Sequence, residues 1–400
     1  MTVAAFLLAL IAILLAAKLC GAIAERLHQP AVLGELIGGV IVGVSGLRLV
    51  DPHDPTIHLL AELGVILLLF LIGLETDLGR LLSVGGSAAA VAIVGVALPF
   101  AGGVAFGHIL GFPVMVSVFL GASLTATSVG ITARVLSDLG HLHDDESQVI
   151  LGAAVVDDII GLVILTIVST LAGGGEVSFA GIARLVVIAF GFVFLAIVTG
   201  SYLAPPLIRL IERIRISRGL FFASLIFALA LAYVADRAGS AVIIGSFAAG
   251  LVLARSGKGR EIEREVHGVA QFFVPIFFIV VGASIDLAAL NTRFVLIGLG
   301  LALIGIIGKV LAGVFVPRRG LRRLVIGVGM IPRGEVGLIF AQVGLATSLL
   351  SSGLYTAVAL MVMVTTLVAP PILARLLEAR TPDGLHGESD YVMDSPLDSK

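Results

Sequence analysis

The stretch VVDDIIGLVILTIV, residues 155–168, is an apolar segment that carries two adjacent carboxylates, Asp157 and Asp158. It belongs to an apolar run, residues 147–172, that is long enough to cross a bilayer, which takes about 20 residues. A charged side chain near the centre of a membrane helix costs roughly 2.5–3.5 kcal/mol, so such residues are functional candidates. The stretch therefore predicts a membrane protein with ionisable groups in its interior.

The composition of the whole chain supports this prediction. Of 400 residues, 58% are hydrophobic and 13% are charged, and the mean hydropathy is +1.15. Soluble domains contain about 25% charged residues. The net charge of −2 gives no indication of nucleic-acid binding, and the single cysteine, Cys20, excludes a disulfide framework and a cysteine-based metal site.

Thirteen apolar runs, separated by turn residues or charges, predict an all-α polytopic membrane protein of about 13 transmembrane helices. The runs are 2–24, 30–50, 57–76, 86–110, 113–137, 147–172, 179–206, 219–237, 240–255, 266–285, 293–316, 321–347 and 354–377. The polar tail, residues 381–400, is predicted to be disordered.

The basic residues are distributed unequally between alternate loops. Seventeen Lys and Arg follow odd-numbered runs, and four follow even-numbered runs. Because cytoplasmic loops carry the excess of Lys and Arg, the N-terminus is expected outside and the C-terminus in the cytoplasm. We expect a multi-pass protein of the inner (plasma) membrane.

Three pairs of segments indicate an internal repeat. VLGELIGGVIV (32–42) matches IIGSFAAGLVL (243–253), LFLIGLETDL (69–78) matches FIVVGASIDL (278–287), and TSVGI (127–131) matches GEVGL (334–338). The offsets are 211, 209 and 207 residues. Matched helices are seven apart, so they cross the membrane in opposite directions, which predicts a six-plus-six inverted repeat typical of secondary transporters.

Most of the charge of the chain lies in loops or at the ends of predicted helices, and the main exceptions are Asp157, Asp158, Lys309, Arg333 and Glu335. The simplest alternative to a functional role is that they form ion pairs that hold helices together. Neighbouring aspartates point about 100° apart on a helix, so one can pair with a lysine while the other faces a cavity. A carboxylate in such a site can hold a proton or a small cation, but not both.

Two predicted helices contain breaks at matching positions of the repeat. SLTATSVG (123–130) is rich in hydroxyls, and GMIPRGEVG (329–337) has Pro332 and Gly334 at mid-span. A break within the membrane frees backbone groups and is tolerated where these line a cavity. Two such breaks indicate a binding site between them.

The oxygens of Thr127 and Ser128, with the two aspartates, suit a hard monovalent cation. The alternative for both hydroxyls is simple helix–helix hydrogen bonding. Glu35 and Glu62 are interpreted as interfacial or dimer-contact residues, with a role in an ion pathway as the alternative. The loop around His141 and His143 is interpreted as solvated, with pH sensing as the alternative.

On these residues the chain resembles the monovalent cation/proton antiporter superfamily, and within it the NapA-type bacterial sodium/proton antiporters. The resemblance covers roughly residues 5–380. The segments that carry it are QPAVLGELIGGVIVG (29–43), LAELGVILLLFLIGLETDL (60–78), TATSVGITARVL (125–136), ILGAAVVDDIIGL (150–162), IGKVLAGV (307–314) and GMIPRGEVGLI (329–339). The adjacent aspartates are similar to those of the electrogenic branch.

The resemblance implies a homodimer with crossed broken helices and elevator-like alternating access. It divides the chain into two parts of a dimerisation domain, two halves of a core domain, a linker helix and a tail. These are 1–85 and 216–292 for dimerisation, 86–178 and 293–380 for the core, 179–215 for the linker helix and 381–400 for the tail. No nucleotide-binding domain is expected in this chain.

The resemblance also implies roles for individual residues. Asp158 is the ion-binding carboxylate, and Asp157 is its neighbour and the partner of Lys309. Thr127 and Ser128 lie at the helix crossing. The supporting residues of the second broken helix are Pro332, Arg333, Gly334 and Glu335.

The sequence therefore predicts an electrogenic Na⁺/H⁺ antiporter, not an enzyme, without cofactors, embedded in the lipid bilayer. Asp157 and Asp158 are the expected Na⁺ ligands. K⁺ or Li⁺ is the alternative cation within the same class, because oxygen ligands alone do not determine size selectivity. A gated cation channel or an organic-anion symporter is the alternative from another class.

Overall fold

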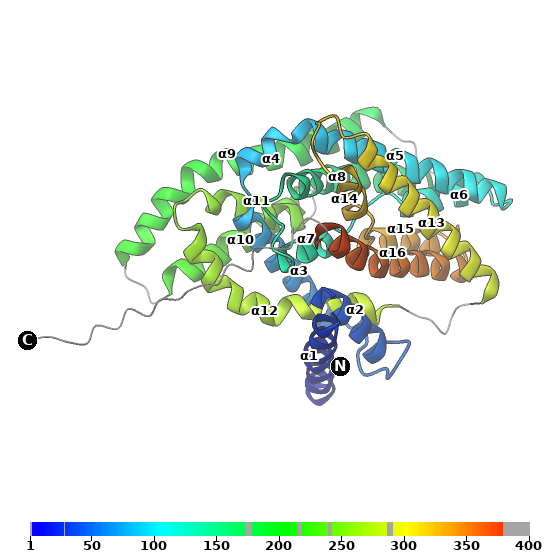
Figure 1. Ribbon diagram of the computed structural model, residues 1–400, viewed down its shortest axis with the longest axis horizontal. Coiled ribbons are helices and arrows are strands. Elements are labelled where there is room, and N and C mark those ends of the chain that lie inside the picture. Colours follow the sequence, from blue (N-terminus) through cyan, green and yellow to red (C-terminus); the bar gives the residue numbers. More distant parts are fainter. Residues whose placement is uncertain are drawn as a thin grey trace, which may run out of the picture.

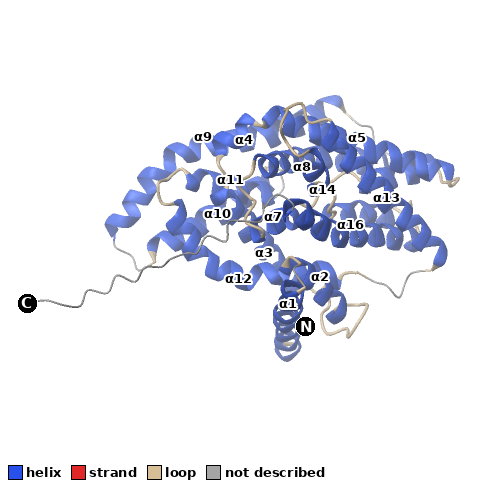
Figure 2. Ribbon diagram, in the orientation of Figure 1, coloured by secondary structure: helices blue, strands red, loops and turns tan. Residues whose placement is uncertain are grey.

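The computed structural model describes residues 2–27, 29–172, 178–214, 218–238, 242–285 and 291–378. Within these residues the regular structure is entirely helical (Figure 2). The helices are α1 Val3–Arg26, α2 Ala31–Val42, α3 Pro55–Glu75, α4 Leu78–Ser83, α5 Gly85–Ile109, α6 Val114–Ser123, α7 Val129–Asp138, α8 Asp145–Ala172, α9 Phe179–Ile214, α10 Gly219–Arg237, α11 Val242–Ala254, α12 Gly259–Ala283, α13 Thr292–Val314, α14 Arg323–Gly329, α15 Glu335–Ala346 and α16 Ser352–Glu378. The predicted disordered tail, 381–400, lies outside the described residues.

The lengths and compositions of these helices fit a polytopic membrane protein. In the described residues, nine helices are long and apolar enough to cross a membrane, and four shorter apolar helices accompany them. Each predicted run contains at least one helix. The runs 113–137 and 321–347 each contain two helices, α6 with α7 and α14 with α15, separated by a non-helical segment.

Three helix boundaries differ clearly from the sequence prediction. The helix α9 continues to Ile214, eight residues beyond the predicted end at residue 206. The run 30–50 stops being helical at Val42, because Gly43 packs against the backbone of Ala283 where a side chain would not fit. In the opposite sense, α12 begins at Gly259 rather than at residue 266. Its first turns are amphipathic, and an ion pair of 3.0 Å between Lys258 and Glu261 stabilises this polar start.

The helices pack as two groups (Figure 1). In one group, α3 packs along α11 and α12, and α2 packs between α1 and α12. In the other group, α5 packs with α6, α8 and α13, while α16 packs with α13 and α15. The contacts between the two groups are fewer and include those of α7 with α2 and α3.

Paired glycines bring helices of the first group into close contact at two crossings. Gly39 of α2 lies against Gly282 of α12, and Gly250 of α11 lies against Gly73 of α3. A Cβ atom on Gly39 would come within 2.8 Å of the Gly282 Cα, and one on Gly250 within 2.7 Å of the Gly73 Cα. The backbones touch because neither residue has a side chain, which is how small residues drive helix association in membranes.

Candidate functional site

The two broken helices cross and are hydrogen-bonded to each other at their breaks. The Ser128 amide, at the start of α7, donates to the Pro332 carbonyl over 2.8 Å. The Thr127 hydroxyl donates to the Met330 carbonyl over 3.2 Å. Both hydroxyl-bearing residues are buried. The breaks therefore satisfy each other's freed backbone groups, as buried backbone in a membrane requires.

Arg333 stabilises the same crossing with its side chain. The guanidinium is fully buried, and its Nη1 donates to the carbonyls of Ala126 over 2.8 Å and Thr125 over 3.2 Å. These carbonyls belong to the non-helical segment that follows α6, where a helix presents its negative end. The Thr366 hydroxyl of α16 in turn donates to the Arg333 carbonyl over 2.5 Å. The positive charge of Arg333 thus offsets the partial negative charge of the carbonyls that the first break leaves without helical partners.

Gly334 precedes α15 and lies against the first broken helix, because a Cβ on Gly334 would come within 2.9 Å of the Ser128 Cβ. The backbone of Glu335 begins α15, but its side chain lies outside the described part of the structure.

We expect Gly334→Ala to separate the crossing and to destabilise the protein by about 1–3 kcal/mol, which is typical of overpacking. The measurement is the melting temperature of the purified protein in detergent. Gly85→Ala is the matched control, since a Cβ there meets nothing within 4 Å. Equal melting temperatures for the two variants would contradict the close contact at the crossing.

Asp157 and Lys309 form a fully buried ion pair between α8 and α13. The Lys309 Nζ lies 2.9 Å from the Asp157 Oδ2, and neither side chain is exposed. The other oxygen, Oδ1, has no hydrogen-bond partner among the described residues. A buried pair gains stability only while both charges are present, so each partner depends on the other.

Asp158 points to a different environment from its neighbour. It is 6% exposed and lines a cavity of about 610 Å³. The cavity continues past Leu162 and Leu165 of α8 to Pro52 and His53, in the loop that precedes α3. Asp158 is therefore accessible from the end of the molecule where that loop lies.

Towards the other end of α8, Asp158 meets an apolar layer. It borders a space of only about 10 Å³, which side chains of four helices surround. These are Leu69 of α3, Val129 of α7, Leu151 and Val155 of α8, and Ile243, Ile244 and Phe247 of α11. Since Leu151 and Val155 precede Asp158 on α8, the layer lies between Asp158 and the start of that helix.

The start of α8 belongs to the basic face, which we define as the end of the molecule formed by the loops 76–77, 139–144, 255–258 and 315–322. A separate cavity of about 2020 Å³ opens there between the ends of α3 and α11. Asp158 is not among its described lining residues. Asp158 thus communicates with the face opposite to the basic face.

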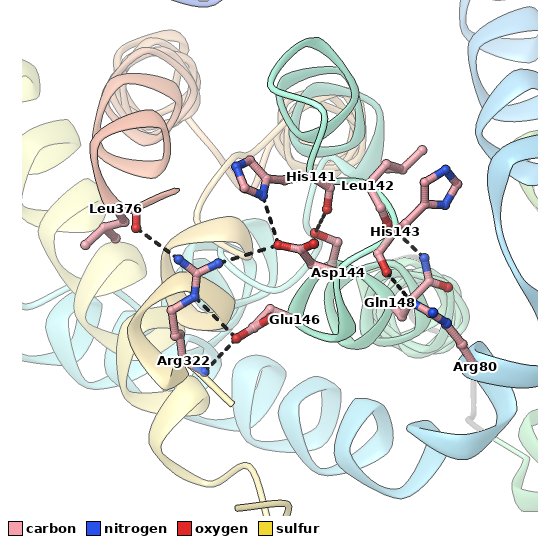
Figure 3. Close-up of polar contacts among 10 residues, drawn as sticks. Arg80, His141, Leu142, His143, Asp144, Glu146, Gln148, Arg322 and Leu376 are labelled. Carbon is pink, nitrogen blue, oxygen red and sulfur yellow. Dashed lines mark hydrogen bonds and ion pairs between the residues drawn. The ribbon is translucent and has the colours of Figure 1, made fainter. Parts of the chain in front are cut away.

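On the basic face, Arg322 connects segments from both sequence halves (Figure 3). Its Nη2 lies 3.6 Å from the Asp144 Oδ2, its Nε donates to Glu146 over 3.3 Å, and its Nη1 donates to the Leu376 carbonyl over 3.2 Å. His141 contacts the same Asp144 oxygen at 2.9 Å. The loop around His141, interpreted from the sequence as solvated, is therefore partly ordered by Arg322, which the sequence analysis did not single out.

The structure brings most of the predicted site residues together. Thr127, Ser128, Pro332 and Gly334 meet at the crossing, and Arg333 bonds to it. A Cβ on Gly161, one turn after Asp157 and Asp158, would come within 3.7 Å of the Ala126 Cβ, so α8 passes directly beside the crossing. The described residues contain no group of three or more His, Cys, Asp or Glu suited to hold a metal.

The cavity and most of its polar lining were not predicted from the sequence. Glu62, Gln342 and Tyr355 line the cavity together with Asp158. Glu62 was interpreted primarily as an interfacial residue, and the apolar run around it gave no signal for the side of α3 on which the cavity lies.

The chain resembles known proteins over nearly its whole length. Residues 10–379 match the family described as "Sodium/hydrogen exchanger, transmembrane". The chain is 41% identical to the high-affinity Na⁺/H⁺ antiporter NhaS3 of Synechocystis, over 94% of this chain and 91% of that protein. It is 37% identical to the Na⁺/H⁺-K⁺ antiporter GerN of Bacillus cereus, over 90% of this chain and 93% of that protein.

The fold has a counterpart among solved structures. The sodium/proton antiporter MjNhaP1 of Methanocaldococcus jannaschii superposes with a TM-score of 0.68, at 18% identity, over 94% of this chain and 97% of that one. This likeness shows a shared fold. With the family match over nearly the whole length and two relatives above 30% identity, the chain belongs to the family of transmembrane sodium/hydrogen exchangers.

Proposed function

We propose that the chain is an electrogenic Na⁺/H⁺ antiporter in which Na⁺ and protons compete for Asp158. The observation that carries this proposal is the position of Asp158 at the boundary between an open cavity and an apolar layer. Alternating access requires an ion-binding carboxylate that is open to solvent on one side of the membrane and closed off from the other side. The names of NhaS3 and GerN support Na⁺/H⁺ exchange, and transporters of this kind are not enzymes.

We further propose that the open cavity faces the outside of the inner (plasma) membrane. The excess of basic residues on the basic face supports a cytoplasmic location for that face. The described arrangement would then be an outward-open state with the cytoplasmic side closed by the apolar layer around Phe247. The N-terminus would lie outside and the C-terminus inside.

The two helix groups are candidates for the moving and stationary parts of an elevator-like mechanism. We propose a core formed by 86–178 and 293–380, and a dimerisation scaffold formed by 1–85 and 216–292 in a homodimer. The sparse contact between the groups supports movement of one against the other. The paired glycine crossings support the inverted repeat, because the 211-residue offset carries Gly39 onto Gly250 and the 209-residue offset carries Gly73 onto Gly282.

The buried pair of Asp157 and Lys309 supplies the proposed second proton. Asp158 would take one proton in exchange for Na⁺, and the second proton would bind to the Asp157 carboxylate when its ion pair with Lys309 opens. Two protons against one Na⁺ move one net charge, for which a membrane potential contributes about 2.3 kcal/mol per 100 mV. The oxygens of Thr127 and Ser128 would assist at the crossing, although both hydroxyls also suit helix–helix hydrogen bonding.

Reconstitution in vesicles tests this function. Internal pH is followed as Na⁺, Li⁺ or K⁺ is added, together with the current on a solid-supported membrane. We expect saturable, Na⁺-dependent proton movement with an apparent Na⁺ affinity that weakens as pH falls, because protons occupy the same carboxylate. Proton movement driven by K⁺ in place of Na⁺ would indicate the alternative of K⁺/H⁺ antiport. Conductance without proton coupling would indicate a channel.

A further inference from the structure

The cavity that leads to Asp158 has an unusual distribution of charge. Among the described residues that line it, two carry carboxylates, Asp158 and Glu62, and none is a lysine or an arginine. Its walls are mainly apolar, with Leu162, Phe277 and Val281 among them. In a cleft with low-dielectric walls, charges of one sign focus the field and raise the local concentration of the opposite ion.

Glu62 lines this cavity from α3, two turns after the start of the helix. Asp54 caps the start of α3 by accepting hydrogen bonds from the amides of Thr56, at 2.9 Å, and Ile57, at 3.4 Å. These bonds hold the pKa of the Asp54 carboxyl below its usual value. The cap fixes the helix start, so Glu62 follows Pro55 by two turns, about 10 Å along the axis. Its side chain is 42% exposed, whereas Asp158 is 6% exposed.

We propose that Glu62 is a cation-recruiting carboxylate, which draws Na⁺ into the cavity but does not hold it during exchange, and that a protonated His58 screens it. The proposal rests on the proposed antiport at Asp158. Because Glu62 is partly exposed, a cation beside it can keep its hydration shell and bind only weakly. The second carboxylate, Asp158, lies further along the same apolar cavity and attracts the cation inward. Glu62 is thus a positioning residue that acts on the concentration of substrate at Asp158.

His58 is the nearest candidate for controlling this charge. Its Nε2 lies 3.7 Å from the Glu62 Oε1, one turn away on the same helix. An imidazole is the side chain whose charge changes between pH 5 and 8, and when protonated it would pair with Glu62. The other titratable groups near this pair are His53 and Asp54 before α3, Asp158 of α8 and Tyr355 of α16. From α12 and α15 the described lining residues carry no charge.

The test measures the Na⁺ concentration dependence of exchange in right-side-out and inside-out membrane vesicles. At about 0.01 M ionic strength, charges act over about 30 Å. We expect Glu62→Gln to raise the apparent KM roughly threefold to tenfold on the cavity side, because removing one of two focusing carboxylates gives at most the low end of the effect of focused charge, about tenfold. The maximal rate and the KM on the other side should stay unchanged. Asp51→Asn is the matched control, since this exposed carboxylate precedes α3 but does not line the cavity.

Salt and pH separate recruitment from direct binding. In about 1 M choline chloride, where the screening length is about 3 Å, the effect of Glu62→Gln should disappear. As the bath pH falls from 8 to 5.5, roughly the range in which imidazoles gain charge, the ratio of variant to wild-type KM should approach one. In a His58→Gln background the ratio should stay constant.

An unchanged KM in Glu62→Gln at low salt overturns the proposal, as does an effect that persists at high salt or a loss of maximal rate, both of which would make Glu62 a direct ligand. A ratio that falls equally in the His58→Gln background overturns the role of His58. A wild-type protein that shows no Na⁺-dependent proton movement would instead refute the proposed antiport. The two failures are therefore distinguishable.

Discussion

Asp158→Asn is expected to reduce Na⁺-dependent proton movement to background. The asparagine has the same size and keeps hydrogen-bonding capacity, but it can neither release a proton nor offer a negative charge to Na⁺. Na⁺ and protons could then no longer be exchanged at this position in the cavity. The variant should fold, since a neutral amide costs less than a carboxylate within a membrane.

Proton flux in vesicles and the melting temperature in detergent measure the two parts of this expectation. Asp236→Asn serves as the control, because Asp236 is an exposed carboxylate on α10 that lines neither the cavity nor the apolar layer. Exchange in Asp158→Asn at about a quarter of the wild-type rate or more would refute the role of this carboxylate.

Lys309→Gln should affect both stability and charge movement. Removing one partner of a buried pair leaves the other charge unsatisfied, which costs about 3–5 kcal/mol. Asp157, fully buried and 2.9 Å from Lys309, would lose its partner and become protonated. The double variant Asp157→Asn with Lys309→Gln should recover most of this stability, since no buried charge would remain in the pair.

The transport effect of Lys309→Gln follows from the proposed second proton. With Asp158 intact, the variant should still exchange Na⁺ for one proton, at a lower rate, but produce no transient current. Proton flux and current are measured on the same preparation. Robust exchange with full current would show that the second proton travels elsewhere, and a melting temperature equal to that of the wild type would contradict the stability argument.

The sequence predicts the elements of the fold better than their ends. Apolar runs of about 20 residues locate the helices because hydrophobic length is a local property. The end of α2 at Val42 is different, since it depends on the contact between Gly43 and Ala283, 240 residues away in the sequence. The early start of α12 reflects an amphipathic turn, which a search for apolar runs does not detect.

In the candidate site, too, the local features could be predicted from the sequence, whereas those that depend on tertiary packing could not. Asp157, Asp158, Lys309 and Arg333 could be predicted as site residues because a charged side chain within an apolar run has a high free-energy cost. The 100° angle between adjacent residues of a helix explains why Asp157 faces Lys309 while Asp158 faces the cavity. The partnership with Lys309 itself came from family resemblance, and the place of Glu62 in the cavity depends on how α3 packs against its neighbours.

The pairing of Asp157 with Lys309 has a consequence for the order of synthesis. The two residues are 152 positions apart, which at roughly 5–20 residues per second corresponds to about 8 to 30 s of translation. The ribosome therefore delivers α8 to the membrane long before α13 exists. During that interval Asp157 has no ammonium beside it, so the buried ion pair cannot form until the second half of the chain has entered the membrane. Closure of this pair is therefore a late step in the maturation of each chain, and it joins a helix of the first half to a helix of the second.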